Sequence, residues 1–224
     1  MSKRHDLFSA TKVIRDEELA KLLRYLSKTN KRGHFMVFLA KSMGLRISEA
    51  ICMRIEDFED YEQGKIIVRV AKKKLLSPQK RRQMGMRVEG YRSSWNERPL
   101  HDQWVDRGTI EVCRQFFKWA RINPRRKRGW VFPGDSPHGH VFDWKVHQWF
   151  VKATKACGIG KRTFHCLRHY LGWKTQEQVK DITATRDILR HTNINTTQMY
   201  VRRKPEELRS LAERVLGKRR EGDT

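Results

Sequence analysis

The chain has 224 residues, enough for one large domain or two small ones with a hydrophobic core, which excludes a short peptide-like binder. Its 49 lysines and arginines outweigh 25 acidic residues and give a formal net charge of +24. This self-repulsion is unfavourable unless the partner is a polyanion, so the balance favours nucleic acid without distinguishing DNA from RNA. With 33% charged and 10% aromatic residues, the composition is that of a folded chain.

The cysteines and the N-terminus exclude several other classes of protein. The four cysteines are widely spread and contain no C-x-x-C pair, so they predict neither a zinc knuckle nor a disulfide scaffold, and we expect them to be reduced. The first residues, MSKRHDLFSATK, lack an apolar signal segment, and no run of about 18 apolar residues occurs. We therefore expect a soluble, intracellular protein with no membrane partner.

Helical patterns fill the first fifty residues after a basic arm at 1–12. Four leucines between residues 19 and 26 recur at helical spacing, behind acidic residues that suit a first helical turn. A more apolar segment follows and predicts a buried helix that ends at Gly44. A third helix opens directly after it. Arg46, at this junction, is either an ion-pair partner of Glu49 or a rigidly held phosphate ligand.

The pattern changes to that of a strand at Ile66, Val68 and Val70, which alternate with other residues after a Gln-Gly turn. The basic segment from there to residue 90 contains Gly and Pro and has no period, so we expect a hairpin tip or mobile loop. Residues 95–100 predict the return strand. Such a hairpin can reach a groove or supply a general acid, although a lysine cluster is usually only solvated.

Two further helices are predicted before the segment that carries the candidate chemistry. One runs through 103–122 and stops at an Asn-Pro pair, and the other starts at Asp143 as its N-cap and ends at Gly158. Between them, His138 and His140 form a His-x-His pair. Because no third ligand lies at useful spacing, we expect no metal there.

The stretch from 163 to 200 gathers side chains that can act on a phosphate. His165 and Arg168 lie three apart in a segment of helical spacing, so they project from one helix face, with Thr163 as a candidate cap. His191 is near the C-terminal end of the next helix, where a protonated imidazole is favoured. Tyr200 follows a polar turn that can deliver its hydroxyl. Together they can hold a phosphate, move protons and attack phosphorus.

The last predicted element is an amphipathic helix that begins at Pro205. Its apolar residues form one stripe, which either closes its own domain or docks on a neighbouring copy: Leu208, Leu211, Ala212, Val215 and Leu216. We therefore expect a catalytic domain at 13–204 and a C-terminal helix and tail at 205–224. Exchange of this helix between protomers is one hypothesis for its role, and packing on its own domain is the other.

Three segments resemble the tyrosine recombinases, also called phage-type integrases. GLRISE at 44–49 is similar to the family's first arginine motif, and HCLRH at 165–169 to its H-x-x-R-H box. LRHTN at 189–193, leading to TTQMY at 196–200, is similar to its L-G-H segment and nucleophile, with Arg190 where many members have Gly. The resemblance covers about 14–204. It implies an α+β, mainly α-helical catalytic domain with a small antiparallel β-sheet or hairpin.

The resemblance also implies an activity, namely site-specific DNA strand transfer in integration, excision or inversion. The reaction would pass through a 3′-phosphotyrosyl intermediate and use no metal or nucleotide cofactor. The implied catalytic residues are a phosphate clamp, a base, a nucleophile and one lysine as general acid: Arg46, Arg168 and His191; His165; Tyr200; and Lys72 or Lys73. The sequence accordingly has no G-x-x-x-x-G-K-[ST] loop.

The partners implied by the resemblance are double-stranded DNA and further copies of the chain, two to four on DNA. The family's N-terminal core-binding domain has no room here, which suggests an excised domain, a minimal recombinase, or help from an accessory DNA-binding protein. The expected setting is the cytoplasmic nucleoid, or a virus or mobile element. Two alternatives stay open: a type IB topoisomerase or telomere resolvase with the same chemistry, and a DNA-binding module of this fold that does not cut.

Overall fold

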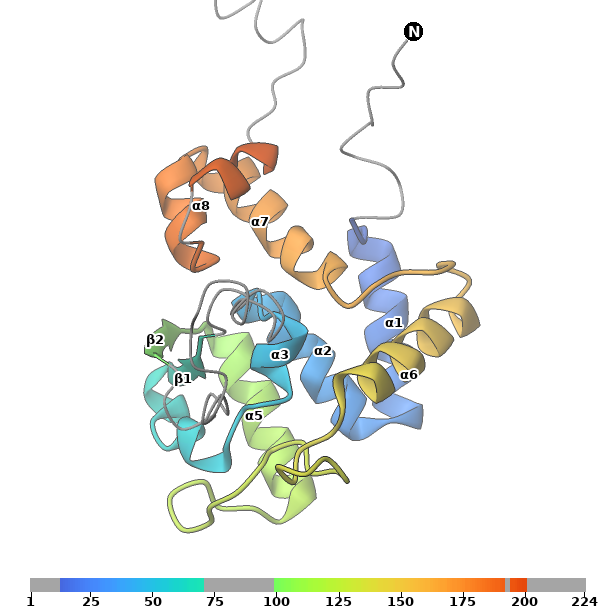
Figure 1. Cartoon of the computed structure of the whole chain (residues 1–224), viewed down its shortest axis with the longest axis vertical. Helices are drawn as coiled ribbons and strands as arrows, with labels where there is room; N and C mark the ends of the chain where they lie inside the picture. The colour runs from blue at the N-terminus through green and yellow to red at the C-terminus, as the bar shows by residue number, and fades with distance from the viewer. Residues whose placement is uncertain (1–12, 71–98, 192–193, 201–224) are drawn as a thin grey trace, which may run out of the picture.

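The computed structural model describes residues 13–70, 99–191 and 194–200 (Figure 1). The α-helices are α1 Asp16–Thr29, α2 Lys31–Met43, α3 Ile47–Ala50, α5 Arg107–Ala120, α6 Asp143–Ala156, α7 Cys166–Val179 and α8 Ile182–Ile188. The short 3-10 helices are η1 Ile55–Phe58, η2 Tyr61–Gln63, η4 Ile194–Thr196 and η5 Gln198–Tyr200. The strands are β1 Lys65–Arg69 and β2 Leu100–Trp104.

Helix α2 is the centre of the core, because it packs against α1, α5 and α7. Figure 1 shows it between α7 and α5. Phe35 of α2 is fully buried and stacks on Phe116 of α5, with ring centroids 3.9 Å apart. The predicted amphipathic helix and its buried neighbour are confirmed as α1 and α2, and Gly44 ends α2 in the left-handed conformation, with φ 59°.

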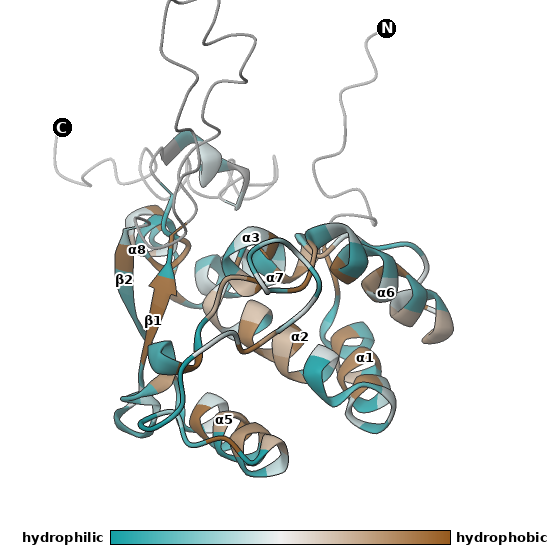
Figure 2. Cartoon of the chain, turned by 60° about the horizontal axis from the view of Figure 1, so that its bottom comes forward, coloured by the Kyte–Doolittle hydropathy of each residue, from teal (hydrophilic) through white to brown (hydrophobic). Residues whose placement is uncertain are grey.

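The two strands form an antiparallel pair in which Lys65 is opposite Trp104 and Arg69 is opposite Leu100. Strand β1 is confirmed, with Ile66 and Val68 buried. The return strand expected at 95–100 was placed too early, because β2 begins at Leu100. Figure 2 shows why: β1 is mostly hydrophobic and β2 mostly hydrophilic, so β2 lacks the apolar alternation that marks a strand.

The positions of several helix ends differ from the sequence predictions. Helix α5 starts at Arg107 with Asp106 as its N-cap, because the residues before it belong to β2. Asp143 is the first residue of α6 rather than its N-cap, and α7 is preceded by His165 rather than capped by Thr163. Such shifts of a few residues are typical of helix termini, where hydrogen bonds are incomplete.

The mainly α-helical α+β fold with a small antiparallel sheet is confirmed. No helix in the described ranges is long and apolar enough to cross a bilayer. The four cysteines, all within those ranges, form no disulfide. The basic arm at 1–12, the hairpin segment with Lys72 and Lys73, and the C-terminal helix and tail at 205–224 lie outside the described residues.

Candidate active site

The turn between α2 and α3 places Arg46 at the edge of the site. Gly44 makes this turn, and a Cβ there would lie 2.8 Å from Leu189 Cδ2, so the position requires glycine for both its backbone and its space. Glu49 closes a capping box, since its carboxylate accepts from the Arg46 backbone N–H at 2.9 Å and from Arg46 Nη1 at 2.8 Å. Arg46 fits both roles that the sequence left open, ion-pair partner and phosphate ligand, because its side chain is ion-paired with Glu49 and also 31% exposed.

Arg168, in the first turn of α7, is fully buried. Its guanidinium donates to the carbonyl oxygens of Gly44 and Leu189, and Nη1 lies 3.8 Å from Glu49 Oε2. Among the described residues, its Nε has no hydrogen-bond partner and keeps an unused donor. Burial, and then the charge of Arg46, lower the pKa of Arg168 to about 9, so the side chain is still a cation at neutral pH.

The carboxylate of Glu49 lies among three arginines. Burial opposes its ionisation, but Arg190, the Arg46 backbone N–H and the Arg46 and Arg168 guanidiniums together hold the pKa of Glu49 below its ordinary value. Glu49 is fully buried, and its ionised form is stabilised by these partners. It therefore fixes the guanidiniums in place while cancelling part of their charge.

A pocket of about 340 Å³ opens beside Arg46 and His165. Its other lining residues come from α3, α6 and the segment before α7: Ile47, Ser48, His147, Thr163 and Phe164. His165 keeps an exposed surface, yet the surrounding protein and then the charges of Arg168 and Arg46 lower its pKa. Arg46 gives this pocket a cation, and His165 gives it a polar group, with which it could receive a phosphate.

His191 lies beyond the end of α8, where Arg190 turns the chain with φ 55°. Its Nδ1 is 2.9 Å from Thr197 Oγ1. Burial, and then Arg168 and Arg46, lower the pKa of His191 to about 3. The expectation of a protonated imidazole is therefore wrong, because desolvation and nearby cations outweigh the attraction of a helix C-terminus.

Tyr200 lies in η5 with only 8% of its surface exposed. Its hydroxyl is 2.9 Å from His169 Nδ1. Its ring fits over α7 because residue 172 is glycine: a Cβ there would lie 2.6 Å from Tyr200 Cζ. Burial raises the pKa of Tyr200 to about 12 against the opposing charge of Arg168, so the phenol is protonated at neutral pH and needs a base to react.

The structure thus brings together the five sequence-predicted residues within the described ranges: Arg46, His165, Arg168, His191 and Tyr200. Two further residues of the site, His169 and Arg190, had no role predicted from the sequence. His169 could have been found from its spacing, since it lies four residues after His165. In the structure, the centroids of the two rings are 4.4 Å apart. The contacts of Arg190 could not have been found from a local pattern, because they reach residues of α2, α3 and β2 that are distant in sequence.

Two other features lie apart from this cluster. His138 and His140 stack together beside Trp130, and no group of three potential metal ligands occurs among the residues that the structure describes.

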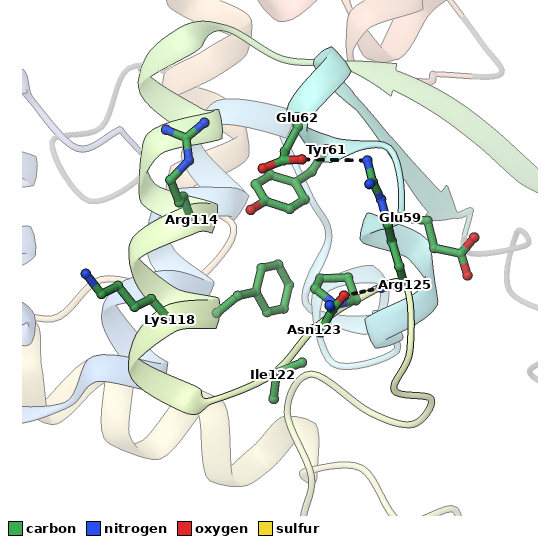
Figure 3. Close-up of a pocket in the computed structure, with 10 residues that line it drawn as sticks. Glu59, Tyr61, Glu62, Arg114, Lys118, Ile122, Asn123 and Arg125 are labelled. Atoms are coloured by element: carbon green, nitrogen blue, oxygen red, sulfur yellow. Dashed lines mark hydrogen bonds and ion pairs between the residues drawn. The ribbon is translucent and has the colours of Figure 1, made fainter.

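A second pocket, of about 310 Å³, lies between α5 and η2 (Figure 3). There Glu62 and Arg125 form an ion pair at 3.6 Å. It contains none of the predicted site residues.

The chain is similar in sequence to proteins of known family. The sequence profile of the Phage integrase family matches residues 12–207. The tyrosine recombinase XerA of Thermococcus kodakarensis is 26% identical over 215 residues, an alignment that covers 93% of this chain and 66% of the relative. A tyrosine recombinase of Pseudothermotoga lettingae is 27% identical over 193 residues, covering 82% of this chain and 54% of the relative. The chain spans less than two thirds of the length of both relatives.

Solved structures share the fold. The crystal structure of XerA recombinase has a TM-score of 0.64 at 17% identity and covers 93% of this chain and 64% of that one. The Tn1549 transposon integrase, solved with transposon right end DNA, has a TM-score of 0.63 at 15% identity, covering 95% and 68%. The catalytic domain of bacteriophage HP1 integrase has 0.55 at 16%, covering 90% and 93%. Because the profile spans most of the sequence, the chain belongs to the phage integrase family of tyrosine recombinases.

Proposed function

We propose that this chain cuts and rejoins double-stranded DNA at specific sites through attack of Tyr200 on a phosphodiester. The attack gives a 3′-phosphotyrosyl link and a free 5′-hydroxyl, and a hydroxyl from another strand reverses the step. The observation that carries the proposal is the position of the Tyr200 phenol, hydrogen-bonded to His169 beside the buried Arg168. A nucleophile, a base and fixed cations are thereby within one cluster.

Charge stabilisation is the task of the arginines in this proposal. Negative charge grows on the non-bridging phosphate oxygens during attack, and Arg46 would neutralise it with bidentate hydrogen bonds. Arg168 would add its positive charge and its unused Nε donor. His191, neutral in the free protein, would donate a further hydrogen bond. Removing one such donor commonly lowers the rate by about 10²–10³-fold. No step in this scheme requires a metal or a nucleotide cofactor.

Proton transfer divides between two histidines and a lysine. The phenolic proton would move to His169 Nδ1, which is within hydrogen-bond distance of the Tyr200 hydroxyl. His165, proposed from the sequence as this base, packs against His169 and lies at the pocket with Arg46, a position suited to a phosphate oxygen. The departing 5′-oxygen would take its proton from Lys72 or Lys73, the candidates that the sequence supplies.

Duplex DNA is the proposed partner, since a chain of net charge +24 gains most from a polyanion. Exchange between two duplexes requires four strand cuts, which favours an assembly of two to four chains. Two structural neighbours support this choice: XerH recombinase was solved bound to its difH substrate, and lambda integrase as a dimer bound to a core site. An accessory DNA-binding protein and a location at the nucleoid or on a mobile element belong to the same proposal.

A nicked duplex that traps the covalent intermediate tests the proposal. Incubation with DNA that flanks the protein's own gene should give a denaturant-resistant adduct with wild-type protein. Tyr200→Phe should abolish the adduct and retain DNA binding. Tyr170→Phe is the matched control, because the Tyr170 hydroxyl bonds Asp16 of α1 at 2.7 Å, and it should keep the adduct. An adduct that persists in Tyr200→Phe would assign the nucleophile elsewhere.

Two further assays separate the alternatives. Strand exchange between two duplexes identifies a recombinase, whereas relaxation of a single supercoiled plasmid identifies a topoisomerase or resolvase type of activity. Binding without any adduct on the flanking DNA would favour a module that does not cut.

A further inference from the structure

Arg190 has a backbone conformation that is unfavourable for a residue with a Cβ. Its φ of 55° lies in the left-handed region, directly before His191. Arg121 has the same φ at the C-cap of α5, but it is exposed. The Arg190 side chain is only 4% exposed. Contacts of this buried side chain therefore have to maintain the conformation.

The Arg190 guanidinium connects three elements that surround the site. Its Nη2 lies 3.0 Å from the Met43 carbonyl oxygen at the end of α2 and 3.3 Å from Glu49 Oε2 in α3. Its Nη1 donates to Gln103 Oε1, and Gln103 is the buried residue of β2. Arg190 thus links the sheet to the carboxylate that organises the arginines.

Arg190 and Arg168 hold the same groups. Both donate to the Gly44 carbonyl oxygen, and both lie beside Glu49 Oε2. Arg46 takes the other carboxylate oxygen, at 2.8 Å. Among these three arginines, Arg46 has the exposed side chain and lines the pocket. A phosphate entering that pocket would compete with Glu49 for Arg46.

This competition has a consequence for Glu49. When Arg46 turns to a phosphate, the buried carboxylate loses its shortest ion pair. A buried carboxylate without enough positive charge is strongly unfavourable, so it would draw Arg46 back. Arg190 is held inside the protein by its bonds to α2 and β2 and keeps its contact with the carboxylate.

We propose that Arg190 is a positioning residue: it is the fixed counter-ion of Glu49, which releases Arg46 to the scissile phosphate, and its bond to Gln103 holds β2 against the site. The inference rests on the proposed function and deepens it. Glycine at this position would relieve the backbone but leave Glu49 to share Arg46 and Arg168. Arg190 itself touches neither substrate nor reacting atoms.

Cleavage kinetics of Arg190→Gly and Arg190→Lys test this role. Arg190→Gly should form the covalent adduct about 10–100-fold more slowly in single turnover, as expected when a catalytic group is slightly misplaced. Arg190→Lys keeps the charge without the planar fork and should recover part of the rate. Arg121→Gly, the same substitution at the same φ but with an exposed side chain, should cleave like wild type. An unchanged rate in Arg190→Gly would overturn the inference.

A neutral scissile linkage separates positioning from a general structural role. A methylphosphonate carries no charge at phosphorus and so makes less demand on Arg46. The ratio of wild-type to Arg190→Gly rates should therefore be smaller on this linkage than on a phosphodiester. An equal ratio on the two linkages would show that Arg190 only supports the fold. Arg190→Lys carries the same test if the glycine variant does not fold.

A measurement without DNA keeps this inference distinct from the proposed function. Arg190→Lys and Glu49→Gln, singly and combined, form a double-mutant cycle in urea unfolding. Coupling between the two changes supports the ion pair, and additive changes overturn it. Wild-type protein that forms no adduct would overturn the proposed function, and the cycle would still decide whether Arg190 stabilises Glu49.

Discussion

The arginine side and the tyrosine side of the site are built in different ways. Arg46 and Arg168 are set by α3 and α7 and are joined through the buried Glu49. Arg168 also donates to the Gly44 carbonyl oxygen. Tyr200 lies in η5, a three-residue 3-10 helix, and its hydroxyl is bonded to His169. Short 3-10 turns have poorer hydrogen-bond geometry than α-helices. The proposed charge-stabilising groups are thus part of the core, whereas the proposed nucleophile is held by a short turn.

This difference separates stability from chemistry. Changes on the arginine side should affect both the free energy of unfolding and adduct formation, because the same contacts serve both. Changes at Tyr200 should affect chemistry with little effect on stability.

Arg168→Ala should lower the free energy of unfolding by about 3–5 kcal/mol, because it removes a buried ion-pair partner of Glu49 and two hydrogen bonds to carbonyls. Tyr200→Phe, which loses one hydrogen bond, should lower it by about 1 kcal/mol. Urea denaturation measures both. Arg114→Ala, at an exposed ion pair with Glu111, is the control and should leave the midpoint unchanged. Similar losses at Arg168 and Tyr200 would remove the contrast.

Gly172→Ala should disturb the tyrosine side, because its Cβ would lie 2.6 Å from Tyr200 Cζ and 2.8 Å from Leu189 Cδ1. Overpacking of this kind costs about 1–3 kcal/mol, and the displaced ring should form the DNA adduct more slowly. Gly108→Ala in α5 is the matched control. Its Cβ would meet Asp106 Oδ2 at an ordinary 3.4 Å, so the free energy of unfolding should stay the same or rise slightly. The adduct rate should not change. Normal adduct rates in Gly172→Ala would show that Tyr200 does not react from this position.

His191→Gln should flatten the pH dependence of stability. The pKa of His191 is lowered to about 3 in the folded protein, against an ordinary value of 6.5. The unfolded chain therefore binds this proton first, and the stability that His191 contributes is present above pH 6.5 and is lost as the pH falls toward 3. Over this window the slope should decrease by up to about 1.4 kcal/mol per pH unit. Unchanged slopes would mean that folding does not lower the pKa of His191.

Arg125→Ala should have the smallest effect, on both stability and cleavage. The Arg125–Glu62 pair lies at the second pocket, and its two side chains are 60% and 47% exposed (Figure 3). Exposed pairs of this kind contribute less than about 1 kcal/mol. The adduct rate per bound DNA should match wild type. A large loss of cleavage would give the second pocket a part in the reaction.

The sequence predicted the core elements because their patterns are local. Leu19, Leu22 and Leu26 repeat at helical spacing, Ile66 and Val68 alternate, and all five are buried. Gly44 ends its helix where the C-cap pattern placed it. Strand β2 was misplaced because it buries a single polar residue, Gln103, and a polar strand carries no such pattern.

The candidate site was predictable in its membership and less so in its contacts. Helical spacing brought together His165 and Arg168, and the family resemblance added Arg46. The charge of His191 depends on neighbours that are distant in sequence. The same holds for Tyr200, which meets His169 across 31 residues. Shifts in pKa and tertiary hydrogen bonds of this kind arise from the assembled fold, so no local sequence pattern predicts them.

The complete burial of Arg168 has a consequence for the proposed reaction with DNA. A guanidinium with no surface cannot meet a DNA strand, and the Tyr200 phenol is nearly as concealed. In the free protein, these two groups proposed to act on DNA are therefore covered. Under the proposed function, duplex binding would therefore have to expose both groups before the first cut.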